Sequence, residues 1–263
     1  MVEHQKEPYA YGYNAITELE GKHGDMRMDV GIIRVKDGFS YENHEAKERA
    51  ILLIEGEVTF EWDGYRETMK RVSCFDDNPV CLHVPRDTKV VITGKDESEL
   101  CYEAVENDNM FEAKLYGQED TVSEVFGKDV LGNTSNRTVR TIIDDDIAPY
   151  SNLVIGEVIN HPGKSSSYPP HYHVQPEVYH YRFLPDTGYG FSLIGDDAYK
   201  VEHRSTSCIR SNVVHPQCSA PGYAMYYVWM IPHIEEKRWL KDRTFEEKHV
   251  WLLDEDVEVW GEK

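Results

Sequence analysis

The chain has 263 residues, of which 40% are hydrophobic and 29% charged, and its formal net charge at pH 7 is −20. This length and apolar content suffice for one large or two small packed domains, which excludes a disordered chain. The negative charge repels nucleic acid and anionic lipid, so neither is expected as a partner.

No apolar run approaches the ~20 residues that span a bilayer, and the start "MVEHQKEPYAYGYN" lacks the pattern of a signal peptide. These features predict a soluble cytoplasmic protein. The five cysteines are an odd number without CxxC spacing, which argues against a disulfide framework and against a thiolate zinc site. They are expected to be reduced and mostly buried thiols.

Short strand-like runs bounded by Gly, Pro, Asn and Asp recur along the chain, without a long stretch of helical periodicity. This pattern predicts an all-β sandwich or barrel with little helix. In the first half "ERAILLIEGEVTFEWDGYRE" leads through a Pro-containing segment to "LCYEAV", and in the second "PEVYHYRFLPDTGYGFSLIG" leads similarly to "YAMYYVWM". Each half reads as a hairpin, a sharp turn and a return strand, which predicts two jelly-roll barrels in tandem.

The polar segment 106–135 is interpreted as the connection between the barrels, with a short helix in it. The first domain is therefore expected to span residues 1–135 and the second 136–263. Near the end, "RTFEEKHVWLL" predicts a helix with Thr244 as N-cap and Glu247 closing a capping box.

The stretch "YPPHYHVQPEVYHY" suggests a metal site in the second half. In an extended strand His171 and His173 point to one face, and Glu177 follows shortly after. His215 in "NVVHPQ" is expected on a neighbouring strand. Three imidazoles and one carboxylate suit a divalent metal such as zinc, manganese, iron, nickel or copper.

An HxH pair alone is more often a surface or packing feature, so the prediction depends on all four residues together. In the first half, His44 and His83 lack such neighbours and are expected to be structural or surface residues. The N-terminal barrel is therefore predicted to bind no metal.

Several segments between residues 130 and 252 resemble a known family. They are "NTSNRTVRTI", "NLVIGEVINHPGKSSSYPPHYH", "EVYHYRFLPDTGYGFSLI", "HPQCSAPGYAMYYVWM" and "RWLKDRTFEEKHVWL". Together they are similar to the 5-deoxyglucuronate isomerases of myo-inositol catabolism, in the cupin superfamily. The resemblance implies two tandem cupin barrels, the C-terminal of which holds a divalent metal on His171, His173, Glu177 and His215. Zinc is the first candidate, with manganese, iron or nickel as alternatives.

The implied reaction is the aldose–ketose isomerisation of 5-deoxy-D-glucuronate to 5-dehydro-2-deoxy-D-gluconate. Two features depart from the inositol-pathway pattern: the short "HYHVQPEVY", and Trp229 where those enzymes usually carry asparagine. Both lean toward the 5-keto-4-deoxyuronate isomerases of pectin breakdown, which share the metal set. An iron-dependent cupin dioxygenase and a non-catalytic sugar-binding cupin are further alternatives.

The isomerisation also needs a group that moves a proton between adjacent carbons. As a metal ligand, Glu177 is less free to do so, which leaves tyrosines or His180 as candidates. Strand alternation from Glu177 directs Tyr179 and Tyr181 toward the metal and directs His180 and Arg182 away, unless a bulge intervenes. Further candidates on a later strand are Tyr226 and Tyr227.

The carboxylate of a sugar acid requires a guanidinium. The resemblance places family arginines at Arg137 and Arg182, and Arg140 is close by. Lys164 and Ser166, which precede the HxH pair, are expected at the mouth of the site. The predicted partner is therefore a small sugar acid, and pairing of barrel edges could produce a homo-oligomer.

Overall fold

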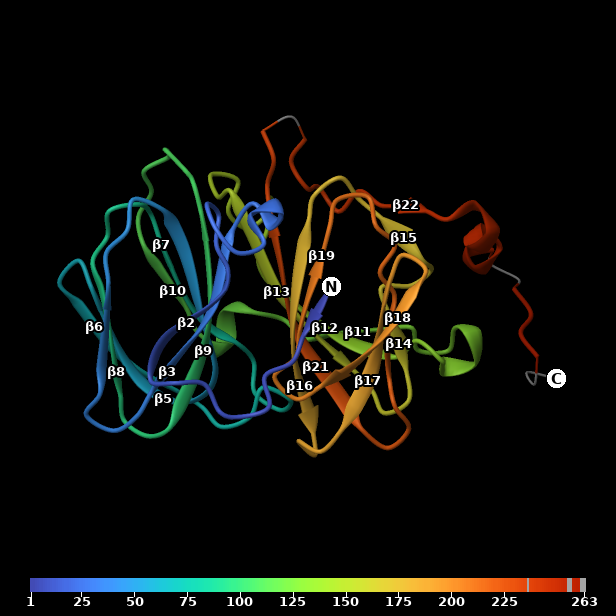
Figure 1. Cartoon of the computed structure of the whole chain (residues 1–263), viewed down its shortest axis with the longest axis horizontal. Coiled ribbons are helices and arrows are strands. Elements are labelled where there is room, and N and C mark those ends of the chain that lie inside the picture. Colours follow the sequence, from blue (N-terminus) through green and yellow to red (C-terminus); the bar gives the residue numbers. More distant parts are fainter. Residues whose placement is uncertain (236, 255–256, 261–263) are drawn as a thin grey trace.

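The computed structural model describes residues 1–235, 237–254 and 257–260. In these ranges the chain forms 22 strands and four 3-10 helices. The prediction of an all-β fold with little helix is therefore confirmed. Figure 1 shows the strands gathered in two lobes, with the N-terminal half of the sequence in one and the C-terminal half in the other.

The first half of the chain contributes the elements up to the connecting segment. These are β1 (Val2–Glu3), β2 (Gly12–Thr17), η1 (Gly24–Met26), β3 (Asp29–Val35), β4 (Ser40–Asn43), β5 (Glu48–Trp62), β6 (Tyr65–Arg71), β7 (Val80–Val84), β8 (Val90–Gly94), β9 (Ser98–Val105) and β10 (Lys114–Tyr116). The connecting segment continues with η2 (Gln118–Asp120), β11 (Glu124–Phe126) and η3 (Leu131–Asn133).

The second half contributes the remaining elements. These are β12 (Arg137–Ile143), β13 (Leu153–Asn160), β14 (Ser165–Ser166), β15 (His171–Tyr172), β16 (Glu177–Leu184), β17 (Tyr189–Ile194), β18 (Asp197–Glu202), β19 (Thr206–Ile209), β20 (Gln217–Ser219), β21 (Ala224–Pro232), β22 (Thr244–Phe245) and η4 (Glu247–Leu253).

The long strand β5 runs through both sheets of the N-terminal barrel. Up to Glu55 it pairs with β7 and β9, and from Gly56 onward it pairs with β6 and β8. Between these parts the register with β9 shifts, and Gly56 has a φ of +111°. A Cβ at Gly56 would lie 2.2 Å from the Ser98 Oγ, so glycine is needed where the strand changes sheets.

The two halves repeat one strand order. The N-terminal sheet runs β10-β7-β5-β9-β3-β2, and the C-terminal sheet runs β1-β19-β16-β21-β13-β12-β11. A second, four-stranded sheet of order β14-β20-β17-β18 covers the C-terminal barrel on its other side. The edge strand β1 comes from the start of the chain and pairs with β19, with Val2 opposite Ser207.

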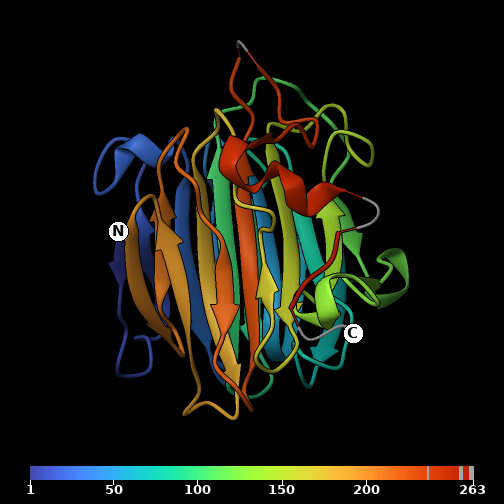
Figure 2. The same ribbon diagram turned by 90° about the vertical axis from the view of Figure 1, so that its right-hand side faces the viewer.

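The hydrophobic core has three parts. One cluster lies between the two lobes and includes Ile32, Leu52, Ile155 and Met230 from facing sheets, and the other two fill the individual barrels. Alternation along β13 explains the division, because Ile155 packs between the lobes whereas Val154 packs inside its own barrel. Figure 2 shows the sheets stacked one behind another. One sheet of the second barrel therefore packs against the first lobe. The opposite face of this sheet lines the barrel interior, where the candidate site lies.

The connecting segment 106–135 divides between the two sheets. Its strand β10 pairs with β7 of the first half, and β11 pairs with β12 of the second half. The short helix expected there is present only as the three-residue 3-10 turns η2 and η3. The domain boundary near residue 135 stays a prediction.

The predicted C-terminal capping is wrong. Thr244 lies in β22, which pairs with β15, and the 3-10 helix η4 begins only at Glu247 with Glu246 as its N-cap residue. Pairing with His171 and Tyr172 holds Thr244 extended, and this tertiary constraint overrides the local capping signal. Among the residues described, none of the helices has the length and apolar character needed to cross a bilayer.

The cysteines follow the prediction. All five are free thiols; Cys74, Cys81, Cys101 and Cys208 are buried, and Cys218 is half-buried. Burial raises the pKa of the Cys74 thiol to about 12, so this thiol stays protonated and unreactive at neutral pH.

Candidate metal centre and substrate cavity

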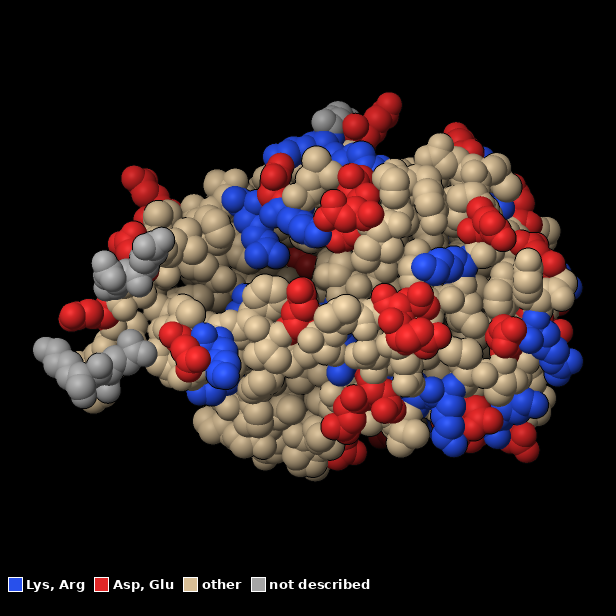
Figure 3. All heavy atoms as spheres, turned by 180° about the vertical axis from the view of Figure 1, so that it is seen from behind, with Lys and Arg blue, Asp and Glu red and all other residues tan. Residues whose placement is uncertain are grey.

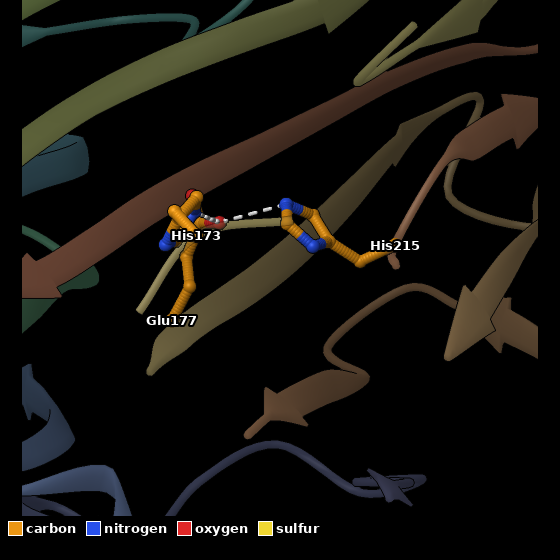
Figure 4. A group of neighbouring side chains, drawn as sticks. All are labelled: His173, Glu177 and His215. Carbon is orange, nitrogen blue, oxygen red and sulfur yellow. Dashed lines mark hydrogen bonds and ion pairs between the residues drawn. The ribbon is translucent and has the colours of Figure 1, made fainter. Parts of the chain in front are cut away.

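Three of the four predicted metal ligands converge inside the C-terminal barrel. His173 follows β15, Glu177 begins β16, and His215 lies just before β20. The ligand atoms of these three buried residues lie within 4.8 Å of one another. Figure 4 shows the imidazoles of His173 and His215 directed at the carboxylate of Glu177.

The contacts within this group are close. The Nε2 atoms of His173 and His215 lie 3.2 Å and 3.1 Å from the same Oε2 atom of Glu177. Burial alone would raise the pKa of the Glu177 carboxyl, but hydrogen bonds and the charge of the two imidazoles outweigh it. The pKa is held well below its usual range, so Glu177 is a carboxylate at neutral pH.

Backbone carbonyls orient all three imidazoles. The Nδ1 atoms of His171, His173 and His215 lie 2.8, 3.0 and 2.8 Å from the carbonyl oxygens of Pro169, Gln175 and Val213. A carbonyl only accepts, so each Nδ1 carries a proton; in the protonated ring Nε2 donates as well, and in the neutral ring Nε2 presents a lone pair.

This arrangement fits a divalent cation. With Nδ1 protonated, the Nε2 lone pairs of His173 and His215 face a carboxylate oxygen that is itself only an acceptor. Acceptors at this separation repel one another unless a cation lies between them or an imidazole is protonated. The group is therefore compatible with a bound divalent metal, the identity of which the ligand set leaves open.

His171 lies beside this group. Its ring centroid is 5.2 Å from that of His215, and it lines the same cavity. Burial, aided by the neighbouring His215, lowers the pKa of His171 to about 3, so the ring is neutral at physiological pH as a metal ligand must be. Its coordination of a metal stays a prediction.

A cavity of about 310 Å³ opens from the metal group. One part of its wall is apolar, with Val139, Val158, Trp229, Ile231 and Trp239. Three cationic side chains also line it, from Arg137, Lys241 and Arg243. Figure 3 shows a hollow on the back of the molecule with Lys and Arg side chains gathered beside it. A cavity of this size with a cationic lining suits a small anionic molecule.

Two of the predicted tyrosines line the cavity. The Tyr179 hydroxyl lies 3.2 Å from the Ser167 Oγ, and the Tyr227 hydroxyl lies 2.8 Å from the Ser166 Oγ. Burial raises the pKa of Tyr227 to about 12 and that of Tyr179 well above its usual value. At neutral pH both phenols are therefore protonated and can donate hydrogen bonds or protons.

The other two tyrosines lie elsewhere. Tyr181 is on the predicted face, but it does not line the cavity; its hydroxyl donates to Gln217 Oε1 at 2.8 Å and lies 2.9 Å from Ser207 Oγ. Tyr226 points to the opposite side of β21 and donates to Glu157 Oε1 at 2.6 Å. Neither tyrosine reaches the position where a substrate would lie.

The prediction that Arg182 binds substrate is wrong. Arg182 is on the face of β16 opposite Glu177, is 1% exposed, and forms an ion pair with Glu99 of the N-terminal half. It also contacts the Nε2 of His180 at 2.6 Å. Strand alternation places both side chains between the barrels, where they serve packing and not the cavity.

The other predicted cations divide between the two sides of β12. Arg137 lines the cavity, whereas Arg140, three residues further, turns toward the N-terminal half and contacts Glu157 Oε2 at 3.3 Å. Lys164 is not among the cavity-lining residues; its amide bonds to the Ser219 Oγ at 3.2 Å, next to the pairing of β14 with β20. The prediction of Lys164 at the substrate is therefore not supported by its position.

The segment after β21 supplies three cavity residues that the sequence analysis did not assign, Trp239, Lys241 and Arg243. They belong to "RWLKDRTFEEKHVWL", which carries the family resemblance. No strand or helix period marks them, because long-range contacts hold this segment at the site, among them the pairing of β22 with β15.

Comparison with known proteins gives a family. The model of the KduI/IolB family matches residues 3–252. The chain belongs to the KduI/IolB family. It is 27% identical over 275 residues to the 5-deoxy-glucuronate isomerase of Bacillus licheniformis, with 91% of this chain and 97% of that protein covered. It is 30% identical over 220 residues to that of Halalkalibacterium halodurans, with 74% and 77% covered.

Solved structures share the fold. An IolB-like protein from Salmonella typhimurium superposes with a TM-score of 0.85 at 20% identity, over 96% of this chain and 99% of that one. A cupin 2 conserved barrel protein from Leptotrichia buccalis superposes with a TM-score of 0.54 at 11% identity, over 87% and 91%. The predictions of a cupin fold and of an enzyme of the isomerase class are thus confirmed.

Proposed function

We propose that this KduI/IolB family member is a metal-dependent aldose–ketose isomerase that acts on a deoxyuronate. The observation that carries the proposal is the convergence of the His173 and His215 Nε2 atoms on one buried carboxylate oxygen of Glu177, beside a cavity with cationic residues. The relatives named as 5-deoxy-glucuronate isomerases make 5-deoxy-D-glucuronate the first candidate substrate, with 5-dehydro-2-deoxy-D-gluconate as product.

The reaction removes a proton from the carbon next to the aldehyde and delivers a proton to the aldehyde carbon. The neighbouring hydroxyl becomes the ketone and the aldehyde oxygen becomes a hydroxyl, so no oxidant or reductant is needed. A divalent metal held by His171, His173, Glu177 and His215 would supply Lewis-acid polarisation of the carbonyl, and zinc is the first candidate.

The chain's own residues contribute the remaining functions. Tyr179 and Tyr227 are protonated and reach the cavity, so they are the candidates for donating a proton or a hydrogen bond to the substrate oxygens. Arg137 is a candidate for the substrate carboxylate. The apolar wall that contains Trp229 limits water around the reacting carbons.

A second candidate substrate is the 5-keto-4-deoxyuronate of pectin breakdown. Trp229 lines the cavity at a position where the inositol-pathway enzymes usually carry asparagine. A large apolar side chain there disfavours a substrate hydroxyl, and therefore favours a sugar acid with fewer hydroxyl groups on that side. Action in the cytoplasm and assembly into a homo-oligomer are parts of the same proposal.

The test is proton NMR of the zinc- or manganese-loaded protein with 5-deoxy-D-glucuronate, followed over time against a metal-stripped control. A ketone isomer that grows at unchanged mass, and only with metal, supports the proposal. If neither deoxyuronate reacts, isomerase activity on this substrate class is refuted, and oxygen uptake then tests a cupin dioxygenase.

The metal content of a variant provides a second, independent test of the proposed metal-dependent mechanism. We expect His215→Ala to lose bound zinc, as measured by elemental analysis, and to lose activity while the barrel stays folded. His44→Ala is the matched control because His44 is exposed in the N-terminal half, and within the described part of the chain its ring bonds only to the Asp87 carbonyl, at 2.9 Å. Full activity of His215→Ala without bound metal would refute the metal-dependent mechanism.

A further inference from the structure

One wall of the cavity is made by residues 237–246, here named the wall segment. The Gln175 side chain holds its start through the Lys237 carbonyl at 2.7 Å, and the pairing of β22 with β15 holds its end next to His171. Arg238 adds a bond of 2.8 Å to the Ser151 carbonyl. The wall segment is therefore fixed at both ends, and its side chains are presented to the cavity in a defined position.

Trp239 of the wall segment carries an unused hydrogen-bond donor. The residue is 6% exposed, lines the cavity, and packs on Trp229 with 5.6 Å between ring centroids. Its indole Nε1 is buried and has no acceptor among the described residues. An indole nitrogen can only donate, and a buried donor without an acceptor is unfavourable, so a ligand oxygen in the cavity would satisfy it.

Arg243 of the wall segment is a cation. It forms no ion pair with any carboxylate among the described residues. Lys241, two residues earlier, shows the contrast, because Asp144 and Asp146 hold its ammonium at 2.9 and 2.7 Å. Arg137 also lines the cavity, and its one side-chain hydrogen bond within the described part of the chain goes to the Ser135 carbonyl at 2.9 Å.

The two guanidinium groups line the same cavity. Burial lowers the pKa of Arg137, and the positive charge of Arg243 lowers it further. The lining of this cavity also includes the carboxylates of Glu124 and Glu177, but neither forms an ion pair with Arg137 or Arg243. An anion bound between the two guanidinium groups would reduce their mutual repulsion. In a chain of net charge −20, where carboxylates are abundant, a pair of arginines left without one indicates a binding site for an external carboxylate.

We propose that Arg243 and Arg137 together bind the substrate carboxylate, and that Trp239 donates a hydrogen bond from Nε1 to an oxygen of the same molecule. The wall segment then selects an anionic, oxygen-rich ligand. With its carboxylate held by the arginines, a sugar acid extends its other end toward His173 and Glu177. This assignment rests on the proposed function, because it takes the cavity to be the substrate site.

The test is isothermal titration calorimetry of the zinc-loaded protein with D-glucuronate and D-glucose, which differ only in the carboxylate. We expect Arg243→Gln to weaken D-glucuronate binding about tenfold or more and to leave D-glucose binding unchanged, because it removes a charge-assisted contact. Arg210→Gln is the matched control, since Arg210 is an exposed arginine of the same half outside the cavity.

Trp239→Phe keeps an aromatic ring against Trp229 and removes only the donor. We expect it to weaken both sugars severalfold, and Trp251→Phe is the control because Trp251 is 50% exposed outside the cavity. Zinc content and the melting temperature establish that each variant is folded, and Arg243→Lys checks whether charge alone suffices. Wild-type affinities of Arg243→Gln and Trp239→Phe, or no binding of D-glucuronate to the wild-type protein, would overturn the assignment.

Turnover of the deoxyuronate separates this inference from the proposed function. If 5-deoxy-D-glucuronate is isomerised while Arg243→Gln and Trp239→Phe keep wild-type KM values, the wall segment does not recognise substrate and the isomerase proposal stands. If neither deoxyuronate reacts but Arg243 is needed for D-glucuronate binding, the assignment stands as a uronate site and the isomerase proposal fails.

Discussion

The Glu103 carboxyl makes the stability of this protein depend on pH. It lies on β9 between the barrels, is 0% exposed, and neither of its oxygens has a hydrogen-bond partner among the described residues. Burial, aided by the negative charge of nearby Glu48, raises its pKa well above the ordinary carboxyl value. In the folded protein the group therefore keeps its proton to a higher pH than in the unfolded chain.

The sign and size of the effect follow from proton linkage. Above the unfolded pKa of about 4.3, the folded state binds one more proton at Glu103 than the unfolded state does. The free energy of unfolding therefore falls as pH rises, by about 1.4 kcal/mol per pH unit, until the folded pKa is reached. This contribution to stability is fully present below about pH 4.3 and is lost progressively as the pH rises from there to the folded pKa.

The perturbation is Glu103→Gln, which keeps the shape and removes the ionisation. Urea unfolding at several pH values between 5 and 8 should show the variant gaining on the wild type by about 1.4 kcal/mol per unit over the lower part of this range. Glu67→Gln, at an exposed position on β6, is the control and should leave the pH profile unchanged. Parallel wild-type and Glu103→Gln profiles across the range would refute the reasoning.

Two further predictions concern the ion pairs between the barrels. Glu157→Gln removes the carboxylate that Arg71 contacts at 2.7 and 2.8 Å and leaves Arg71 and Arg140 as buried, uncompensated charges. We expect a loss of about 3–5 kcal/mol in the free energy of unfolding, and a loss below 1 kcal/mol would contradict a buried charge at this position. Arg182→Ala should destabilise the protein because it removes the guanidinium in contact with Glu99 Oε2 and leaves this carboxylate only the longer ion pair with Arg204, at 3.6 Å, yet it should leave the KM for a deoxyuronate unchanged. A raised KM at unchanged stability would instead indicate that Arg182 binds the substrate.

The cluster of His173, Glu177 and His215 could be predicted from the sequence because it depends largely on short-range spacing. His171 and His173 are two residues apart, Glu177 opens the next strand, and period-two alternation correctly assigns the faces of β16. The same alternation directs Arg182 away from Glu177, and the structure agrees. The resemblance, by contrast, had implied that Arg182 binds substrate.

The remaining parts of the site depend on contacts between segments that are distant in sequence. Trp239 and Arg243 reach the cavity because β22 pairs with β15, and no local pattern encodes that pairing. The expected helix start at Thr244 failed for the same reason, since a capping signal is weaker than the strand pairing that opposes it. Local periodicity therefore predicts the fold class and the cluster of His173, Glu177 and His215, but not the opposite wall of the cavity.

The pairing of β1 with β19 has a consequence for the order of folding during synthesis. Val2 emerges from the ribosome before all the strands of the N-terminal barrel, but its partner Ser207 emerges only after them. The N-terminal barrel can assemble its own strands early, because β2 to β10 follow one another in the sequence. Val2 and Glu3 must stay unpaired in that interval and can join the edge of the sheet only after β19 has been made, so a strand that is synthesised before both barrels pairs among the last.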